Sequence, residues 1–358
     1  MKTIALSVPM DYPVASPFGG LFSIVNPVIV QLTTDEGLEA FGICFTSSNN
    51  RVASLKATVD DLAPLVIGQD VARTNEAWQK LWGAVGNYGH TGGYPLYALS
   101  AIDNALWVLR AKMLGLPLST LLGGYREKVP AYASYMLWRD WTIDRLQKEA
   151  ADLVKKGFKA MKMRVGMYPF DVEVQRYKAV REAVGKDISI LIDCNWAYSV
   201  TDAIRLGRML DGLGVYWFED PLASDDPEQI HQVSEALDMP VTVGETWCTK
   251  YGFRTLFEKK AADIYMIDVM QVGGVTEWIR VANMAQAQNL PVCSHLFNDI
   301  SCHLVASVPN GLWCEYMPWW DKIYKDPPQV KDGFIEIPKV PGIGLEIDPM
   351  AIKKWEMK

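Results

Sequence analysis

The sequence lacks the features that mark several large classes of protein. It has no apolar run approaching the roughly 20 residues of a membrane-spanning helix, and its first residues lack the apolar core and cleavage pattern of a signal peptide. Six cysteines show no CxxC spacing and there are only four histidines, so neither a disulfide framework nor a zinc site is indicated. We therefore expect a cytoplasmic protein with no membrane partner.

The sequence also lacks a net positive charge. The formal net charge is −7 and the pI is near 5.3. Nucleic acids and anionic membrane surfaces attract basic patches, so neither is expected as the main partner. A small ligand remains the natural partner for a chain of 358 residues, of which 49% are hydrophobic. This length allows a large core, in two domains or in one barrel with a substantial addition.

Six short apolar runs in the second half of the chain each stop at an acidic or basic residue. The gaps between these residues are 20 to 27 positions, about the length of one strand-plus-helix unit in a barrel of alternating strands and helices. All strands of such a barrel are parallel, so their C-terminal ends share one mouth. The spacing therefore predicts a single active site, and its residues are Asp193, Glu219, Glu245, Asp268, His295 and Glu315.

The same alternation predicts the domain organisation. Residues 1–125 contain an apparent strand pair and three helical patterns, which indicates an α+β domain. Eight strands alternating with helices follow within residues 126–320, and they predict an α/β fold in which the barrel is a modified TIM barrel of the (β/α)7β type. Residues 321–358 are rich in proline and glycine, so we expect this tail to pack back on the first domain. The first domain and the tail would then together form a capping domain on the barrel.

Three of the strand-ending residues are carboxylates on successive strands. Asp193, Glu219 and Glu245 would lie side by side, and unpaired carboxylates held that close raise one another's pKa unless a cation lies among them. Ligands that are all oxygen favour Mg²⁺, or Mn²⁺, over zinc. The alternative is that each carboxylate pairs with a nearby lysine or arginine.

Other polar residues at the same mouth suggest acid–base chemistry. Asp268 and His295 end neighbouring strands, so the carboxylate can fix the imidazole tautomer and raise its basicity. Lys162 and Arg164 lie two residues apart on one strand face, where they could hold a substrate carboxylate or enolate, or merely neutralise Asp193.

Two further positions complete the candidate site. Glu315 follows an apolar stretch, and burial there is expected to raise its pKa and keep it protonated as a hydrogen-bond donor, although a structural acid is a close alternative. Asn195, two residues after Asp193, could orient a ligand or a water on the metal. A metal beside these groups suits removal of the weakly acidic proton α to a carboxylate, because cations stabilise the resulting enolate.

These residues, in this order, resemble the enolase superfamily, and within it the mandelate racemase subgroup. The resemblance covers the whole chain and rests on the stretches IDCN, WFEDP, VGETW, VGGVTEW and SHLFNDISCHLVASVP. It implies that Asp193, Glu219 and Glu245 bind Mg²⁺. It also implies that His295 with Asp268 is the base and Glu315 the electrophilic acid, that Lys162 binds the substrate carboxylate, and that the protein forms a homo-oligomer, an octamer or smaller.

One departure from the family pattern bears on the reaction. Mandelate racemase has Lys-x-Lys where this chain has Lys162-Met163-Arg164, and arginine is a poor proton acceptor. One-base chemistry is then the simpler interpretation, in which His295 starts the dehydration of a sugar acid or related hydroxy acid to a 2-keto acid. A racemase or epimerase is the alternative, and a noncatalytic carboxylate-binding protein is a third hypothesis.

The resemblance also implies a specificity loop over the mouth, near residues 11–27. This segment is apolar, with Phe18 and Phe22, and Trp247 could add to an apolar wall that contacts the substrate. The polar residues Arg139, Asp140, Asn298 and Asp299 could instead supply contacts to hydroxyl groups.

Overall fold

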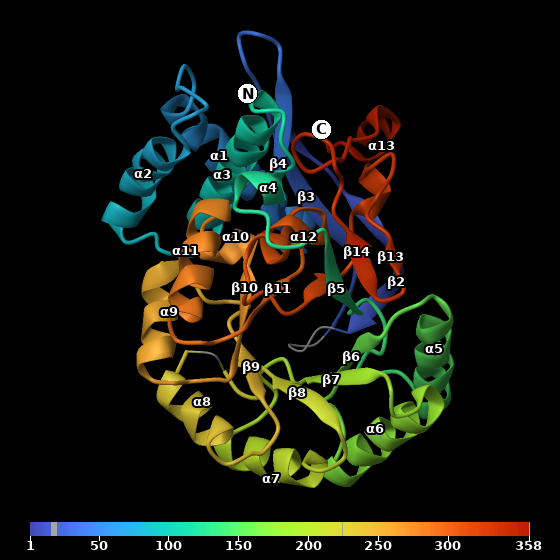
Figure 1. Ribbon diagram of the computed structural model, residues 1–358. Helices are drawn as coiled ribbons and strands as arrows, with labels where there is room; N and C mark the ends of the chain where they lie inside the picture. Colours follow the sequence, from blue (N-terminus) through green and yellow to red (C-terminus); the bar gives the residue numbers. More distant parts are fainter. Residues whose placement is uncertain (16–19, 224, 358) are drawn as a thin grey trace.

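A closed barrel forms the larger part of the computed structural model, which describes residues 1–15, 20–223 and 225–357 (Figure 1). Neighbouring barrel strands pair in parallel in chain order, and the last strand pairs with the first. The remaining gap is closed by hydrogen bonds from the backbone N–H of Leu312 to the Val292 carbonyl (2.7 Å) and of Ser294 to the Trp313 carbonyl (3.1 Å). The strands are β5 (Lys128–Ala133), β6 (Ala160–Arg164), β7 (Ser189–Asp193), β8 (Val215–Glu219), β9 (Val241–Val243), β10 (Ile264–Asp268), β11 (Val292–His295) and β12 (Cys314–Tyr316).

Helices connect these strands around the outside of the barrel. In α5 the buried residues Leu146, Ala150 and Leu153 recur at three- and four-residue intervals, so one face of the helix packs on the strands. Each connection contains at least one helix, which confirms the predicted (β/α)7β architecture. The helices are α5 (Ile143–Lys155), α6 (Phe170–Val184), α7 (Val200–Leu210), α8 (Pro227–Ser234), α9 (Thr249–Glu258), the short α10 (Val269–Val272), α11 (Val275–Gln286) and α12 (Asn298–Ser307).

An antiparallel sheet with helices against it forms the smaller unit. Helix α3 packs closely on β4, where a Cβ on Gly42 would lie 2.1 Å from the carbonyl oxygen of Ala101. Only glycine permits this approach. The elements are β1 (Lys2–Ala5), β2 (Val8–Ala15), β3 (Leu21–Thr33), β4 (Glu39–Thr46), α1 (Asn49–Leu62), α2 (Thr74–Val85), α3 (Tyr94–Met113) and α4 (Leu118–Leu121).

The segment expected as a specificity loop is largely strand. Residues 11–15 belong to β2 and residues 21–27 to β3, and the two strands pair antiparallel through Val14 with Phe22 and Ala15 with Leu21. These residues are therefore paired strands and not an open loop, and that the segment covers the mouth stays a prediction. Phe18 lies outside the described residues.

The tail contacts both units. After a 3-10 turn (Asp321–Ile323), strands β13 (Val330–Lys331) and β14 (Phe334–Glu336) form a hairpin, and β14 pairs with β5 of the barrel. The expectation that the tail packs on the first domain therefore misses this hairpin. Beyond α13 (Pro349–Trp355), the N–H of Met357 donates to the Ala5 carbonyl and the N–H of Ser7 to the Trp355 carbonyl, both at 2.9 Å.

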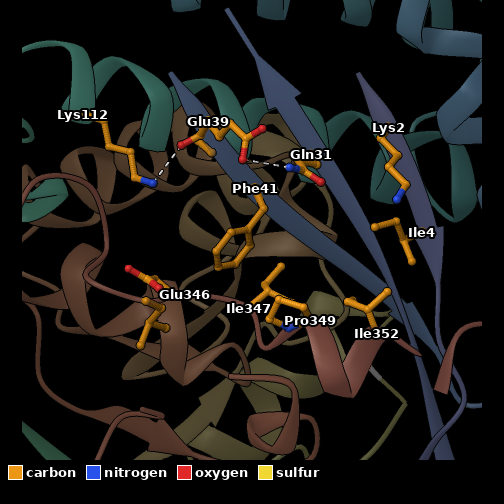
Figure 2. A pocket seen from close by; sticks show the side chains of 12 residues that line it. Lys2, Ile4, Gln31, Glu39, Phe41, Lys112, Glu346, Ile347, Pro349 and Ile352 are labelled. Atoms are coloured by element: carbon orange, nitrogen blue, oxygen red, sulfur yellow. Dashed lines mark hydrogen bonds between the residues drawn. The ribbon is translucent and has the colours of Figure 1, made fainter. Parts of the chain in front are cut away.

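A cavity of about 520 Å³ opens between the sheet and the tail (Figure 2). Phe41 and Ile352 line it, and so does Lys112, whose ammonium donates to the Glu39 carbonyl. In the described ranges, no helix is both long enough and apolar enough to cross a membrane.

Candidate active site

The polar residues that end the barrel strands meet at one mouth. The parallel register places Arg164 of β6 opposite Asp193 of β7, and Asp193 opposite Glu219 of β8. It also places Asp268 of β10 opposite His295 of β11. The carboxylates of Asp193 and Glu219 are fully buried. The repeated spacing in the sequence therefore does bring these groups together.

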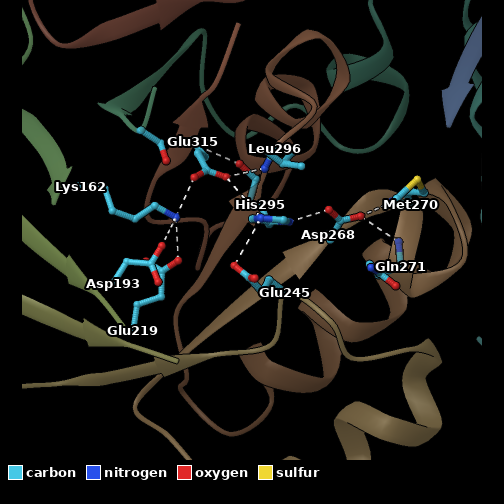
Figure 3. A network of polar contacts seen from close by, with 12 residues as sticks. Lys162, Asp193, Glu219, Glu245, Asp268, Met270, Gln271, His295, Leu296 and Glu315 are labelled. Carbon is cyan, nitrogen blue, oxygen red and sulfur yellow. Dashed lines mark hydrogen bonds and ion pairs between the residues drawn. The ribbon is translucent and has the colours of Figure 1, made fainter. Parts of the chain in front are cut away.

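Lys162 lies among three of the carboxylates (Figure 3). Its Nζ is 2.7 Å from Oε1 of Glu219 and 2.9 Å from Oε1 of Glu315. The Oδ2 atom of Asp193 is 3.3 Å away. Burial alone would lower the pKa of Lys162, but the three negative charges outweigh it and raise the pKa well above its usual value. Lys162 is therefore a cation here and a poor proton acceptor.

His295 is held between two carboxylates. Its Nδ1 is 2.6 Å from Oδ2 of Asp268, and its Nε2 is 3.3 Å from Oε2 of Glu245. The other oxygen of Asp268 accepts the backbone N–H groups of Met270 (2.7 Å) and Gln271 (2.8 Å), so the carboxylate is fixed. Burial lowers the pKa of His295, but Glu245 and Asp268 outweigh it and raise the pKa to about 10. The His295–Asp268 contact expected from the sequence is thus formed, and in this arrangement the imidazole is protonated. A cation held by Glu245 would compensate the carboxylate that faces Nε2, which would lower the pKa of His295 toward that of a general base.

The protonation state of Glu315 differs from the one expected from the sequence. Burial raises its pKa, as predicted, but Lys162 and His295 outweigh burial and bring the pKa to about 2. In addition, the backbone N–H of Leu296 donates to its Oε2 at 2.6 Å. The prediction that Glu315 stays protonated is therefore wrong for this arrangement, in which it accepts hydrogen bonds.

Arg164 is fixed by contacts on three sides. Its guanidinium carbon lies 3.9 Å from the centre of the Trp138 ring, and Nη1 donates to the Ser134 carbonyl at 2.7 Å. Its Nη2 donates to the Ser134 hydroxyl at 3.1 Å, while Nε lies 3.6 Å from Oδ2 of Asp193. The guanidinium therefore faces the metal-binding candidates, as the neutralising interpretation requires.

The three sequence-predicted substrate contacts, Asn195, Phe22 and Trp247, lie in different surroundings. The backbone N–H of Asn195 donates to Oδ1 of Asp193 at 2.9 Å, and its side-chain oxygen accepts a hydrogen bond from Arg139. Phe22 packs edge-on against Trp319, with 5.7 Å between ring centres. Trp247 lines a cavity of about 400 Å³ at the start of α9. Their contacts to a substrate remain predictions.

Two of the polar residues considered for hydroxyl contacts are already satisfied internally. Asp299 accepts hydrogen bonds from the Trp320 indole (3.2 Å) and from the Tyr324 hydroxyl. The amide of Asn298 donates to Asp321 at 3.3 Å. Both are buried, so they belong to a network behind the mouth.

The carboxylates Asp193, Glu219 and Glu245 fit a divalent cation by their chemistry. Across residues 1–15, 20–223 and 225–357, no three His, Cys, Asp or Glu side chains have metal-site geometry, because Lys162 lies between two of these carboxylates and His295 faces the third. However, burial and the neighbouring carboxylates raise the pKa of Glu219, while Lys162 opposes them. Such a buried, all-oxygen group gains from added positive charge, which a hard cation such as Mg²⁺ supplies.

Sequence reasoning missed Asp220, which follows Glu219. It is buried, and neither carboxylate oxygen has a hydrogen-bond partner among the described residues. Its φ of 40° lies in the left-handed region, which a non-glycine residue rarely adopts. Left-handed residues cluster at the strand ends of this mouth, where strain often marks function; others are Leu137, Asn195, Trp196, Leu296 and Phe297. Aspartate and asparagine adopt this conformation more readily than most residues, but the sequence does not show at which positions they do so.

Two family models match the chain. The mandelate racemase / muconate lactonizing enzyme N-terminal domain matches residues 4–123, and the enolase C-terminal domain-like model matches residues 145–351. The chain belongs to the mandelate racemase / muconate lactonizing enzyme family. This confirms the resemblance drawn from the motifs.

The relatives of this chain include two enzymes whose names refer to sugar acids or their lactones. An arabinonate dehydratase of Saccharolobus solfataricus is 30% identical over 345 residues, which cover 92% of this chain and 91% of the relative. A D-galactarolactone cycloisomerase of Agrobacterium fabrum is 31% identical over 351 residues, which cover 92% and 91%.

Solved structures of other proteins match the fold closely. A racemase from Streptomyces coelicolor A3(2) with bound magnesium superposes with a TM-score of 0.95 at 28% identity, covering 99% of each chain. L-Talarate dehydratase from Polaromonas sp. JS666, complexed with Mg and L-glucarate, has a TM-score of 0.94 at 26% identity and covers 99% of this chain and 96% of that one.

Proposed function

We propose that this family member removes the proton α to the carboxylate of a sugar acid or related hydroxy acid and dehydrates the resulting enolate to a 2-keto acid. The observation that carries the proposal is the His295–Asp268 contact of 2.6 Å at a mouth that also holds Lys162 and Arg164. The names of the relatives, among them arabinonate dehydratase and L-talarate dehydratase, support this substrate class.

The metal of the reaction is proposed to be Mg²⁺, with Mn²⁺ as a substitute. Asp193, Glu219 and Glu245 would hold it, and the bound magnesium of the racemase and L-talarate dehydratase structures supports this assignment. When bound, the ion would stabilise the negative charge of the enolate.

The residues of the chain have the following proposed roles. Lys162 and Arg164 bind the substrate carboxylate by charge, and Nε2 of His295 accepts the α-proton while Asp268 holds the ring. The Cα–H electron pair forms the enolate, and the β-hydroxyl leaves as water with the proton that His295 returns. The enol then tautomerises to the 2-keto acid, so atoms and charge balance.

Racemisation or epimerisation is the competing function, favoured by the similarity to the Streptomyces coelicolor racemase. It requires a second base on the opposite face of the substrate. Arg164 does not deprotonate usefully, and the contacts of Lys162 with Glu219 and Glu315 keep it protonated. These two features favour one-base dehydration.

A substrate screen tests the proposal. The protein is incubated with Mg²⁺ and a library of mono- and diacid sugars plus mandelate-like acids, and 2-keto acid formation is read together with α-deuterium exchange by NMR in D₂O. Keto acid from one stereochemical set is the expected result. Exchange or inversion without keto acid would favour a racemase, whereas binding without exchange would favour the noncatalytic carboxylate-binding hypothesis.

The His295→Asn variant identifies the base. We expect it to lose keto acid formation and α-exchange, by on the order of 10²-fold or more, because a positioned general base contributes that much. Mg²⁺ binding, measured by calorimetry, should persist. An enzyme that retained its turnover would exclude His295 as the base.

A further inference from the structure

Two charged residues of α6, Glu173 and Arg176, are buried outside the candidate active site. They are one helical turn apart and only 1% and 2% exposed. Their side chains form an ion pair in which Nε of Arg176 lies 3.3 Å from Oε2 of Glu173. A buried ion pair is costly to desolvate and is therefore weak evidence of a stabilising role. The hydrogen bonds that Glu173 and Arg176 form with the neighbouring loops indicate a different role.

Glu173 holds the loop that follows β6. Its Oε1 accepts hydrogen bonds from the backbone N–H groups of Gly166, Met167 and Tyr168, each at 3.0 Å. This loop begins directly after the strand that carries Lys162 and Arg164. One carboxylate oxygen therefore fixes the backbone where that strand opens into the mouth.

Arg176 holds the loop that follows β5. Its Nη1 donates to the Trp141 carbonyl at 2.6 Å, and its Nη2 donates to the Arg139 carbonyl at 2.8 Å. Its guanidinium also stacks on the ring of Tyr168, 4.7 Å from the ring centre. A single ion pair thus links the loops that follow two neighbouring strands.

The loop that follows β5 contacts the candidate active site directly. Trp138 carries the ring on which Arg164 stacks. Arg139 donates to the side chain of Asn195, whose backbone N–H in turn donates to Asp193. Each link is a hydrogen bond or a ring contact, so a displaced loop would move both arginines of the mouth.

We propose that Glu173 and Arg176 are positioning residues. They set the orientation of Arg164 for recognition of the substrate carboxylate, and that of Arg139 where it holds Asn195. The reference to the substrate rests on the proposed function. The guanidinium of Arg176 is a planar fork that serves two carbonyls at once, whereas a lysine ammonium is a point charge on a flexible stem. The arginine at this position is therefore required for the geometry of the loop as well as for its charge.

Arg176→Lys tests this role while leaving a positive charge beside Glu173. For the acid identified as substrate, we expect KM to rise on the order of tenfold with a smaller change in kcat, because Arg164 contacts the carboxylate in ground and transition states alike. Amide hydrogen exchange of residues 137–142 in the Mg²⁺-loaded protein should become faster.

Arg181→Lys is the matched control on the same helix. Arg181 donates to the carbonyls of Gly185, Ile188 and Gly214, which precede β7 and β8 at the opposite end of the barrel. Its replacement is expected to lower Tm but to leave KM unchanged. Equal KM changes in both variants, or an unchanged KM and unchanged exchange in Arg176→Lys, would overturn the proposal.

The inference can fail separately from the proposed function. If no acid of the library is turned over, the proposed function fails, and the exchange of residues 137–142 and 165–168 in the Mg²⁺-loaded protein still decides whether the ion pair holds both loops. Faster exchange in Arg176→Lys but not in Arg181→Lys supports it. Should Arg176→Lys fail to fold, Glu173→Gln is expected to speed exchange at residues 166–168, and protection as in the unaltered protein would overturn the inference.

Discussion

At the mouth of the barrel, the ammonium of Lys162 compensates three buried carboxylates. Asp193, Glu219 and Glu315 each lie within 3.3 Å of its Nζ. Removing one partner of a buried ion pair is strongly destabilising because the other charge remains without compensation. A divalent cation bound by the same carboxylates can take over that compensation.

The variant Lys162→Met lacks this ammonium. Without divalent cations at pH 7, we expect the free energy of unfolding to fall by about 3–5 kcal/mol, since three carboxylates lose their counter-charge. Adding Mg²⁺ should recover a large part of the loss. Thermal or urea unfolding with and without Mg²⁺ measures both effects.

Lys148→Met provides the control, because Lys148 pairs with Asp152 on the surface, where its side chain is 68% exposed. Its replacement should change stability by no more than about 1 kcal/mol, with no Mg²⁺ dependence. If Lys162→Met unfolded like the control, or if Mg²⁺ had no larger effect on it, the carboxylates would not depend on a nearby cation.

Residue identity predicted the members of the site better than it predicted their ionisation. The polar residues that end the strands could be recognised because each interrupts an apolar run at a regular interval. The low pKa of Glu315 could not, since it depends on Lys162 reaching it from another strand. Glu173 and Arg176 were also missed, because in sequence they look like the polar positions of an ordinary exposed helix face.

Between elements, α3 of the smaller unit caps α11 of the barrel. The N-cap residue of α11 is Gly274, which has no side chain to accept the free N–H groups of the first turn. Asn104 of α3 accepts the N–H of Val275 at 3.0 Å, and Asp103 accepts the N–H of Thr276 at 2.9 Å. The two units are therefore joined by hydrogen bonds that a helix normally receives from its own N-cap.

The Asn104→Leu variant should lose this link. Leucine has a similar volume but no acceptor, so the N–H of Val275 would be buried without a partner, and we expect the free energy of unfolding to fall by about 1–3 kcal/mol. Chemical unfolding measures the change. Asn283→Leu, at an exposed position of the same helix α11, is the control and should have little effect. Equal stability of the two variants would mean that the cap contributes nothing.

Strand and helix periodicity predicted the order of the barrel elements, because each strand is a short apolar run and each helix has an apolar stripe. It did not predict the pairing of β2 with β3, whose register shifts between Pro9 and Val14. It also missed the β14 contact with β5, since a strand of three residues gives no periodic signal. Such pairings are fixed by tertiary contacts.

At the scale of the whole molecule, the C-terminal residues form hydrogen bonds with the antiparallel sheet of the smaller unit. Met357 and Trp355 form backbone hydrogen bonds with Ala5 and Ser7, which flank the end of β1. Strand β1 pairs with β3, and the far end of β3 carries Phe22 against Trp319 beside the mouth. The tail can therefore influence the active site through this sheet.

Removal of residues 349–358 should consequently affect both stability and substrate binding. We expect Tm to fall by about 5 °C or more, because the backbone groups of Ala5 and Ser7 lose their partners and the core loses the buried side chain of Ala351. Amide exchange of β1 and β3 should become faster, and the KM of the substrate should rise as Phe22 becomes less fixed. Met350→Ala, at a position of α13 that is 67% exposed, is the matched control and should change neither quantity. A truncated protein with the Tm of the full chain would show that the tail does not hold the sheet, whereas a lower Tm with unchanged KM would confine its role to stability.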